Sequence, residues 1–210
     1  MRLGGSRFVA GETLDDAVRA LRGLNEQGLW ANTTLLGEAV RDEAQARAVS
    51  EEYVRVVDRL AKEELRANVA LKLTHLGLEL SEDAAYENVR RVVERGRFIR
   101  IDMEQSAFVD ATLRIYRRLR DDGLDNVGTV LQAYLYRTED DLGALLPLRP
   151  NLRLVKGAYL EPHDVAYPQK ADVDANYVRL LERMLRGGGY TAVATHDEAI
   201  LEHSIRFAER

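Results

Sequence analysis

Short apolar runs alternate along the chain with longer segments in which apolar side chains recur every three or four residues. The longer segments predict helices at 13–27, 42–65, 81–94, 106–121, 138–146, 173–186 and 197–210. The short runs predict strands at 29–36, 68–74, 98–103, 127–134, 152–155 and 190–195. Strict alternation of strand and helix is typical of right-handed βαβ units, so we expect an α/β fold with a parallel sheet.

Polar residues at the ends of the helical segments support these boundaries. Thr13 and Ser81 are predicted N-caps, and acidic residues follow each of them in the first turn. Thr138 is expected to cap the helix 138–146 in the same way. Gly28 is expected to end the first helix, so one helix precedes the first strand.

The positions of polar residues distinguish between an open doubly wound sheet and a β/α barrel. No G-x-G-x-x-G motif follows the first strand, which removes the best signal for a dinucleotide-binding sheet. A β/α barrel builds its active site from the carboxyl ends of its strands. Five of the six strands carry a polar or charged residue there: Lys72, Asp102, Gln132, Arg153, Lys156 and Thr195-His196. We therefore expect a TIM-like barrel.

The stretch 151–159, NLRLVKGAY, carries two cations at the end of an apolar strand. Removing a cation from water is costly unless an anion meets it, so Arg153 and Lys156 indicate a carboxylate or an electron-rich cofactor nearby. The simpler interpretation is that both side chains flank the strand and reach solvent. Gly157 favours the first interpretation, because a glycine after a strand lets another group approach the backbone closely.

Composition limits the class of protein. The chain has 210 residues, a net charge of −5 and no cysteine, which excludes disulfides, thiolate metal sites and a cysteine nucleophile and gives no support for nucleic-acid binding. No apolar run reaches the roughly 18 residues of a membrane span, and residues 1–13 lack the apolar core of a signal peptide. The four histidines have no ligand spacing, so no metal site is expected. A single cytoplasmic domain covering 1–210 is the expectation.

Seven segments resemble the proline dehydrogenase family, in its monofunctional bacterial form and in the corresponding domain of bifunctional proline utilisation proteins. They are TTLLGEAV (33–40), ALKLTHLGL (70–78), IRIDMEQ (99–105), VLQAYL (130–135), RLVKGAY (153–159), DVDANY (172–177) and VATHDEA (193–199). Their order and spacing match along nearly the whole chain. The resemblance implies a (β/α)8 barrel that uses FAD to oxidise L-proline to Δ1-pyrroline-5-carboxylate, with hydride transfer to flavin N5.

The chain departs from the family pattern in one respect. The family barrel has eight strands and ends with a Tyr-x-x-Arg-Arg-type segment that holds the substrate carboxylate. Only an N-terminal helix and about six βα units are predicted here, and no Arg-Arg pair stands in a matching position. Six units do not close an eight-stranded barrel. The chain is therefore expected to lack the C-terminal βα units of the domain.

The resemblance also implies the residues that contact the cofactor. Arg153 would lie beside flavin N5, where a cation stabilises the reduced ring, and Gln132 would face the pyrimidine edge, to which it can both donate and accept. A glutamine bonded to backbone is an equally good interpretation of Gln132. The full set implied for cofactor binding is Met103, Gln132, Arg153, Lys156, Gly157, Ala158, Thr195 and His196.

Substrate binding is assigned by the resemblance to Lys72 and Tyr159. Lys72 would bind the carboxylate of proline, and the ring of Tyr159 would pack on the substrate. Asp102, counted with Arg153 as catalytic, would pair with Lys72 or with an arginine from the absent segment. The simpler alternatives are a structural ion pair for Asp102 and a core position for Tyr159. No residue is an evident general base; a site rich in cations would favour the neutral amine of proline.

The family resemblance also implies an electron acceptor, and the sequence leaves two alternative functions open. The resemblance implies a membrane quinone as electron acceptor and transient association with the inner face of the cell membrane; the oligomeric state is left open. Two other functions stay open: a barrel enzyme for another, phosphate-bearing substrate, and a truncated FAD-binding or scaffold module without turnover. The absent Arg-Arg pair supports the second alternative.

Overall fold

A computed structural model describes residues 9–209 of the chain, which divide into two compact units. Unit 1 comprises Met1–Arg100 and Leu119–Asn126, and unit 2 comprises Ile101–Arg118 and Val127–Arg210. Each unit is described by itself.

Helices and strands alternate along the chain as the hydrophobic pattern predicts. The helices are α1 Leu14–Glu26, α2 Glu43–Lys62, α3 Glu82–Val93, α4 Val109–Asp121, α5 Thr138–Leu145, α6 Lys170–Arg186 and α7 Glu198–Ala208. The strands are β1 Ala31–Thr33, β2 Ala67–Leu71, β3 Ile99–Ile101, β4 Val127–Gln132, β5 Asn151–Val155 and β6 Tyr190–Val193. Short 3-10 helices lie at Thr74–Leu76, Ser106–Phe108 and Leu146–Leu148.

The strands are ordered β1-β2-β3-β4-β5-β6 in the sheet, and pairing is parallel. In unit 1, Ala31 is in register with Ala67; in unit 2, Leu152 of β5 is in register with Thr129 of β4 and Thr191 of β6. A doubly wound sheet reverses its strand order at one point, whereas this order is sequential. The predicted α/β fold of the barrel type is confirmed.

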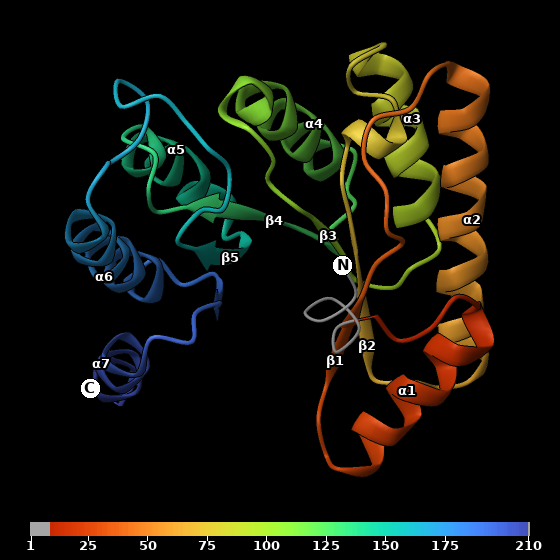
Figure 1. Ribbon diagram of the computed structural model, residues 1–210, viewed down its shortest axis with the longest axis horizontal. Coiled ribbons are helices and arrows are strands. Elements are labelled where there is room, and N and C mark those ends of the chain that lie inside the picture. Colours follow the sequence, from red (N-terminus) through yellow and green to blue (C-terminus); the bar gives the residue numbers. More distant parts are fainter. Residues whose placement is uncertain (1–8, 210) are drawn as a thin grey trace, which may run out of the picture. The chain divides into compact units, whose positions relative to one another are not determined.

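Unit 1 packs α2 and α3 side by side (Figure 1). The apolar faces of these helices are buried, with Tyr53, Leu60 and Val89 at most 1% exposed. The hydroxyl of buried Ser50 on α2 donates to the backbone carbonyl of Asn88 on α3 over 2.8 Å. A polar contact inside an apolar interface fixes how the two helices align, because an unpaired hydroxyl there would be costly.

The strands of unit 2 differ in how deeply they are buried. All six residues of β4 are buried, whereas β5 alternates between buried and partly exposed positions. The hydroxyl of buried Tyr177 on α6 donates to Leu154 O over 2.8 Å and accepts from Ala194 N over 3.1 Å. One side chain thus joins β5 to the residue that follows β6.

Three details differ from the predictions. The first strand has three residues instead of the expected eight, and Leu29, Trp30 and Leu36 around it are at least half exposed. Each of the other strands except β5 is likewise shorter than expected. Lys72, Asp102, Thr195 and His196 therefore follow their strands, whereas Gln132 is the last residue of β4.

Thr138 is not an N-cap. The cap residue of α5 is Arg137, and Thr138 is the first helical residue, where its hydroxyl donates to Gln132 O over 2.6 Å. By contrast, Thr13 forms a reciprocal capping box with Asp16, and Ser81 caps α3, as predicted. The predicted end of the last helix, Arg210, lies outside the described residues.

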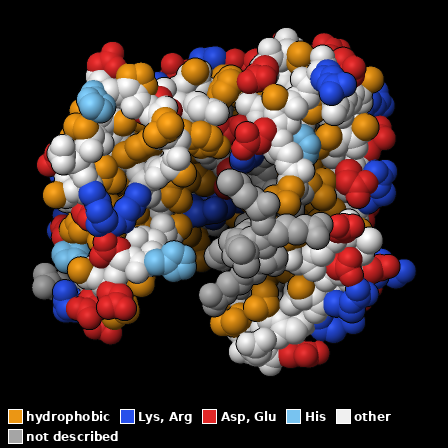
Figure 2. Space-filling model, viewed as in Figure 1, with side chains coloured by type: hydrophobic (Ala, Val, Ile, Leu, Met, Phe, Trp, Pro, Cys, Tyr) orange, Lys and Arg blue, Asp and Glu red, His pale blue; other side chains and the backbone are white. Residues whose placement is uncertain are grey.

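Charged side chains of both signs are interspersed along α2, at the right of Figure 2. They form local pairs such as Arg47 with Glu51 and Arg59 with Glu63, which are typical of a solvated helix face. Among residues 9–209, no helix has the length and the apolar character that crossing a membrane requires.

Candidate functional site

An ion pair in unit 2 joins Asp102, at the carboxyl end of β3, to Arg153 on β5. Asp102 directly follows β3, and Arg153 is the middle residue of β5. Arg153 Nη2 lies 3.1 Å from Asp102 Oδ1, and each side chain is about a quarter exposed. The sequence singled out both residues but did not predict that they pair. Because Asp102 restrains the guanidinium, the cation is held at a defined place while part of it stays accessible.

Gln132 ends β4, the strand next to β5, and is 2% exposed. Its Nε2 donates to Glu104 O over 2.8 Å, and its backbone carbonyl accepts from Thr138. Its Oε1 is buried and has no hydrogen-bond partner among the described residues. Buried polar atoms are nearly always satisfied, so an acceptor left over at a strand end indicates a donor from a ligand or from water. The interpretation of Gln132 as bonded to backbone thus holds for its amide nitrogen, and the predicted contact of the other end with a cofactor stays a prediction.

Lys156, the first residue after β5, lies between two carboxylates. Its Nζ is 2.5 Å from Asp174 Oδ1 and 2.8 Å from Asp197 Oδ2. Burial alone would lower the pKa of Lys156, but the hydrogen bonds to Asp174 and Asp197 outweigh it and raise the pKa. The expected anion beside this cation is therefore supplied by the protein itself.

Gly157 adopts φ +124°, a conformation that a residue with a side chain rarely takes. A Cβ at this position would lie 2.3 Å from the ring of Tyr134, the second residue after β4. The close approach that Gly157 was expected to allow is thus made by a tyrosine ring. The hydroxyl of Tyr134 is buried, and burial together with the nearby Glu161 carboxylate raises the pKa of Tyr134 to about 12.

The segment after β5 is tied to its neighbours in unit 2. Glu161 accepts hydrogen bonds from Ser106 N over 2.7 Å and from Ser106 Oγ over 2.6 Å. Tyr167 N donates to Tyr134 O over 2.8 Å. These bonds restrain the loop that carries the predicted substrate residue Tyr159, which is partly exposed.

The remaining predicted cofactor residues of unit 2 also follow strand ends. Met103 comes two residues after β3 and is buried, whereas Ala158 and His196 are exposed. Thr195 is partly exposed, and its Oγ1 accepts from Asp197 N over 3.1 Å. Unit 2 therefore holds every residue predicted to contact the cofactor, distributed over the ends of β3, β4, β5 and β6.

Lys72 belongs to unit 1, where it follows β2. Its ammonium contacts the Glu38 carboxylate, and the lysine side chain is 28% exposed. The anion expected beside Lys72 is therefore supplied, in this structure, by the carboxylate of Glu38. The predicted pairing of Lys72 with Asp102 joins residues of different units and stays a prediction.

His75, which the sequence does not single out as a site residue, also lies in unit 1. Burial, and then the charge of Lys72, lower the pKa of His75. Its ring lies edge-on to Tyr53 and fills the space beside Gly37, where an added Cβ would come within 2.4 Å of it. His75 is therefore a packed histidine beside Gly37 whose neutral form is favoured by its surroundings.

Asp174 and Asp197 are the functional candidates that sequence reasoning missed. Each stands where a helix signal already explained it, since Asp197 caps α7 and Asp174 lies near the start of α6. Their partner Lys156 is 18 and 41 residues away in the sequence, so spacing alone gave no link. Among the described residues, no group of His, Asp and Glu has an arrangement that could hold a metal ion.

Comparisons with known proteins identify the family. A family model described as Proline dehydrogenase matches residues 17–210. Proline dehydrogenase of Deinococcus radiodurans is 44% identical over 209 residues, covering 96% of this chain and 67% of the relative. Proline dehydrogenase 1 of Bacillus subtilis (strain 168) is 42% identical over 204 residues, covering 95% of this chain and 67% of the relative.

Solved structures agree with the fold. Proline utilization A (PutA) from Bdellovibrio bacteriovorus, inactivated by N-propargylglycine, superposes with a TM-score of 0.85 at 26% identity, covering 96% of this chain and 26% of that one. A PutA mutant of Bradyrhizobium japonicum, at 21% identity and a TM-score of 0.74, shows the same fold. The chain thus spans about two thirds of the curated relatives and about a quarter of these longer proteins. By the match over 17–210 and by these identities, the chain belongs to the proline dehydrogenase family.

Proposed function

We propose that this chain takes part in the oxidation of L-proline to Δ1-pyrroline-5-carboxylate, with FAD as cofactor and a quinone as electron acceptor. The observation that carries the proposal is the buried Gln132, whose Oε1 has no partner among the described residues and which ends the strand between β3 and β5. Asp102 and Arg153 form their ion pair on those two strands. A hydrogen-bond acceptor and a restrained cation on the neighbouring strands β4 and β5 suit a flavin ring.

The residues of unit 2 fit this cofactor. The imide N–H of a flavin would satisfy Gln132 Oε1, and the guanidinium of Arg153 would meet the negative charge of the reduced ring. The other residues proposed to hold FAD are Met103, Lys156, Gly157, Ala158, Thr195 and His196. When bound, FAD supplies the acceptor for the hydride that leaves the carbon next to the ring nitrogen of proline.

Arg153 has the central electrostatic role in this proposal. A guanidinium carries its charge at every physiological pH, so it stabilises negative charge without a proton transfer. Asp102 restrains Arg153 through the 3.1 Å contact, which lowers the cost of reorganising the cation during the reaction. Both residues therefore count as the catalytic candidates of the chain.

Substrate binding is assigned to Lys72 for the carboxylate and to Tyr159 for the ring of proline. In this proposal the substrate carboxylate replaces Glu38 as the anion beside Lys72. Cations such as Arg153 and Lys72 favour the neutral amine of proline over its ammonium form. If the pH–rate profile shows no ionisation below about pH 9, the proposal that the site favours the neutral amine of proline is wrong.

The quinone and the membrane contact rest on the family resemblance. A water-soluble quinone is expected to reoxidise the proline-reduced chain, whereas NAD⁺ is not. Reoxidation by NAD⁺ and not by the quinone would rule out the proposed acceptor.

Cosedimentation with anionic lipid vesicles tests the proposed association with the membrane surface.

The first experiment identifies the cofactor and the product. The purified 210-residue chain is denatured and the released flavin is identified by chromatography; FAD is the expected result. The native chain is then supplied with L-proline and a soluble quinone, and the pyrroline product is measured with o-aminobenzaldehyde. FAD without product would favour the scaffold alternative, and absence of flavin with binding of phosphate-bearing ligands would favour a different barrel enzyme.

A further inference from the structure

Four charged side chains form a cluster on one side of unit 2: Lys156, Lys170, Asp174 and Asp197. Lys156 Nζ contacts Asp174 Oδ1 at 2.5 Å and Asp197 Oδ2 at 2.8 Å. Lys170 contacts the other oxygen of Asp174 and lies 3.4 Å from Asp197 Oδ2. Two ammonium groups thus meet two carboxylates, and the cluster has no net charge.

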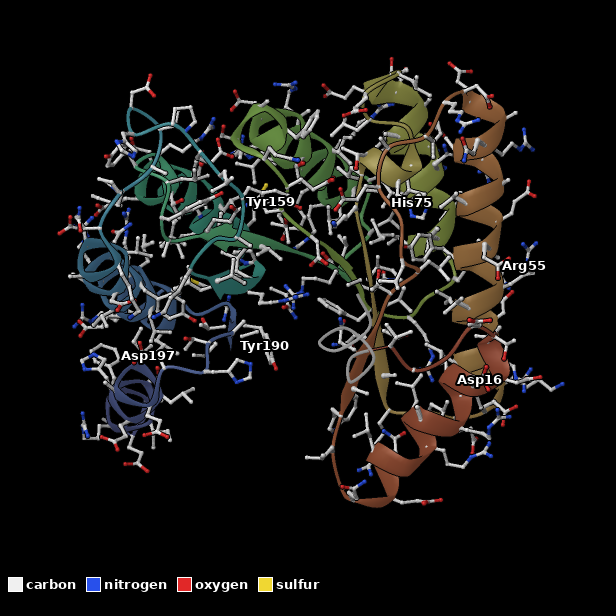
Figure 3. All side chains as sticks on the ribbon, viewed as in Figure 1. Asp16, Arg55, His75, Tyr159, Tyr190 and Asp197 are labelled. Atoms are coloured by element: carbon white, nitrogen blue, oxygen red, sulfur yellow. The ribbon has the colours of Figure 1, made fainter. Side chains whose placement is uncertain are left out.

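The cluster joins three segments of the chain. Lys156 begins the loop after β5, Asp174 lies near the start of α6, and Asp197 is the N-cap of α7. Figure 3 shows Asp197 at the amino-terminal end of α7, on the side of α6. A single ammonium therefore ties the end of β5 to the first turns of the next two helices.

The two lysines differ in their surroundings. The side chains of Lys156, Asp174 and Asp197 are each about 25% exposed. The side chain of Lys170, by contrast, is 73% exposed. Exposed ion pairs contribute little, and partly buried charge-assisted hydrogen bonds contribute more. Lys156 is therefore the structural centre of the cluster, and Lys170 is peripheral.

The charge of Lys156 is already matched by protein carboxylates. Two of its three ammonium protons are directed to Asp174 and Asp197. The hydrogen bond from Lys156 lowers the pKa of Asp197 to about 2, which agrees with a tight contact. A bound anion would have to displace one of these carboxylates to receive the full charge of this lysine.

Asp197 also shapes the segment before it. Its Oδ1 accepts from Ile200 N over 3.4 Å as the cap of α7, while its backbone N–H donates to Thr195 Oγ1. At the other end of this segment, the backbone N–H of Ala194 donates to the hydroxyl of Tyr177. Residues 194–197, which include the candidate cofactor residues Thr195 and His196, are thus held at both ends.

We propose that Asp174 and Asp197 are positioning residues that clamp Lys156 and thereby fix the segment carrying Thr195 and His196. In this role Lys156 organises the loops through its side chain and leaves electrostatic stabilisation of the bound ring to Arg153. We call the contacts of Lys156 with Asp174 and Asp197 the clamp. The expectation that the clamp affects flavin affinity rests on the proposed function, whereas the clamp itself does not.

Four variants separate the clamp from other roles of these residues. Lys156→Met removes the bridging cation, and Asp174→Asn removes one carboxylate charge. Asp197→Asn removes the other charge but keeps an oxygen that can cap α7, since asparagine is a good N-cap. Lys170→Met is the matched control, because it removes a cation from the same two carboxylates at an exposed position.

Amide hydrogen exchange of residues 193–200 in the flavin-free chain is the first readout. We expect Lys156→Met and Asp197→Asn to increase the local exchange rate about tenfold, and Lys170→Met to change it less than about twofold. If Lys156→Met does not fold, the two isosteric asparagine variants carry the test. Unchanged exchange in both asparagine variants would overturn the clamp.

The dissociation constant of added FAD is the second readout. We expect Lys156→Met and Asp197→Asn each to weaken binding about tenfold, and the double variant also about tenfold instead of a hundredfold, because both remove one interaction. Additive losses, or faster exchange with unchanged FAD affinity, would overturn the positioning role. If the parent chain shows the exchange effect but binds no FAD, the proposed function fails and the clamp stands.

Discussion

The two ends of the strands use polar residues in different ways. At the amino ends, in unit 1, Arg97 donates to Leu65 O over 2.8 Å and to Leu60 O over 3.1 Å. Asn126 donates to Val93 O and Arg97 O, each over 2.8 Å. These side chains satisfy backbone carbonyls that helices and turns leave without partners. Arg97 and Asn126 therefore stabilise the loops that precede β3 and β4.

At the carboxyl ends, in unit 2, the partners are side chains of opposite charge. Arg153 meets Asp102, and Lys156 meets Asp174 and Asp197. Gln132 keeps an acceptor with no partner among the described residues. Hydrogen-bonding capacity is thus used up at one end and partly kept at the other. The unfilled hydrogen-bonding capacity of Gln132, and not the number of polar residues, therefore distinguishes the candidate site.

The largest expected effect is that of Arg153→Met. If Arg153 stabilises the reduced ring, the rate of flavin reduction by L-proline should fall about 100-fold, as for other preorganised electrostatic groups. Anaerobic stopped-flow absorbance measures this rate. Arg179→Met is the control, because Arg179 is an exposed α6 residue paired with Glu139, and a change within about twofold is expected. Reduction of Arg153→Met at the parent rate would remove Arg153 from the catalytic assignment.

Arg97→Met should act on stability and not on the cofactor. Losing charge-assisted hydrogen bonds to three carbonyls is expected to lower the free energy of unfolding by about 2–3 kcal/mol. Urea unfolding measures the change, and Arg90→Met, which removes an exposed helix pair with Glu94, should cost less than about 0.5 kcal/mol. A large loss of FAD affinity in folded Arg97→Met would break the contrast between the two ends.

A smaller effect is expected for Gln132→Leu. This change removes the acceptor proposed for the flavin imide, so the dissociation constant of FAD should rise about tenfold. The unfolding free energy should change by no more than about 1 kcal/mol, because only one amide bond of the parent, to Glu104 O, is lost. Unaltered FAD affinity would mean that Oε1 serves a water molecule or another donor.

The smallest effect is a dependence on acid. The pKa of Asp197 is about 2 in the folded chain against 3.8 for an ordinary aspartate, and the pKa of Asp174 is lowered too. Carboxylates with depressed pKa values stabilise the fold above their unfolded pKa and lose that contribution as the pH falls toward the folded one. Thermal unfolding at about pH 5 and about pH 3 should therefore show a larger decrease for the parent than for Asp197→Asn. Equal decreases would mean that Asp197 contributes nothing to acid stability.

Much of the fold could be predicted from the sequence because it is encoded locally. Apolar periodicity located the seven helices and six strands of the described residues, and cap chemistry placed Thr13 and Ser81 correctly. The first strand is predicted too long because the run LWANTTLL has apolar residues at both ends, and in the structure these ends are exposed. Thr138 was misread because a hydroxyl at a helix start can also bond a carbonyl of the preceding turn.

The candidate site was predictable in its residues but not in its contacts. A polar or charged residue within or just after an apolar run is visible in the sequence, so Asp102, Gln132 and Arg153 can be picked out without a structure. Their partners depend on which strands are neighbours, and Asp174 and Asp197 reach Lys156 only through folding. The reason for Gly157 likewise became clear only from the position of the Tyr134 ring.

The most direct test of the account is an anaerobic titration of the purified chain with L-proline, followed by visible absorbance. We expect flavin bands that bleach in proportion to added L-proline and are unaffected by D-proline. Bound flavin that is bleached by dithionite but not by L-proline would contradict this proposal, because the chain would then hold a reducible cofactor that proline does not reduce.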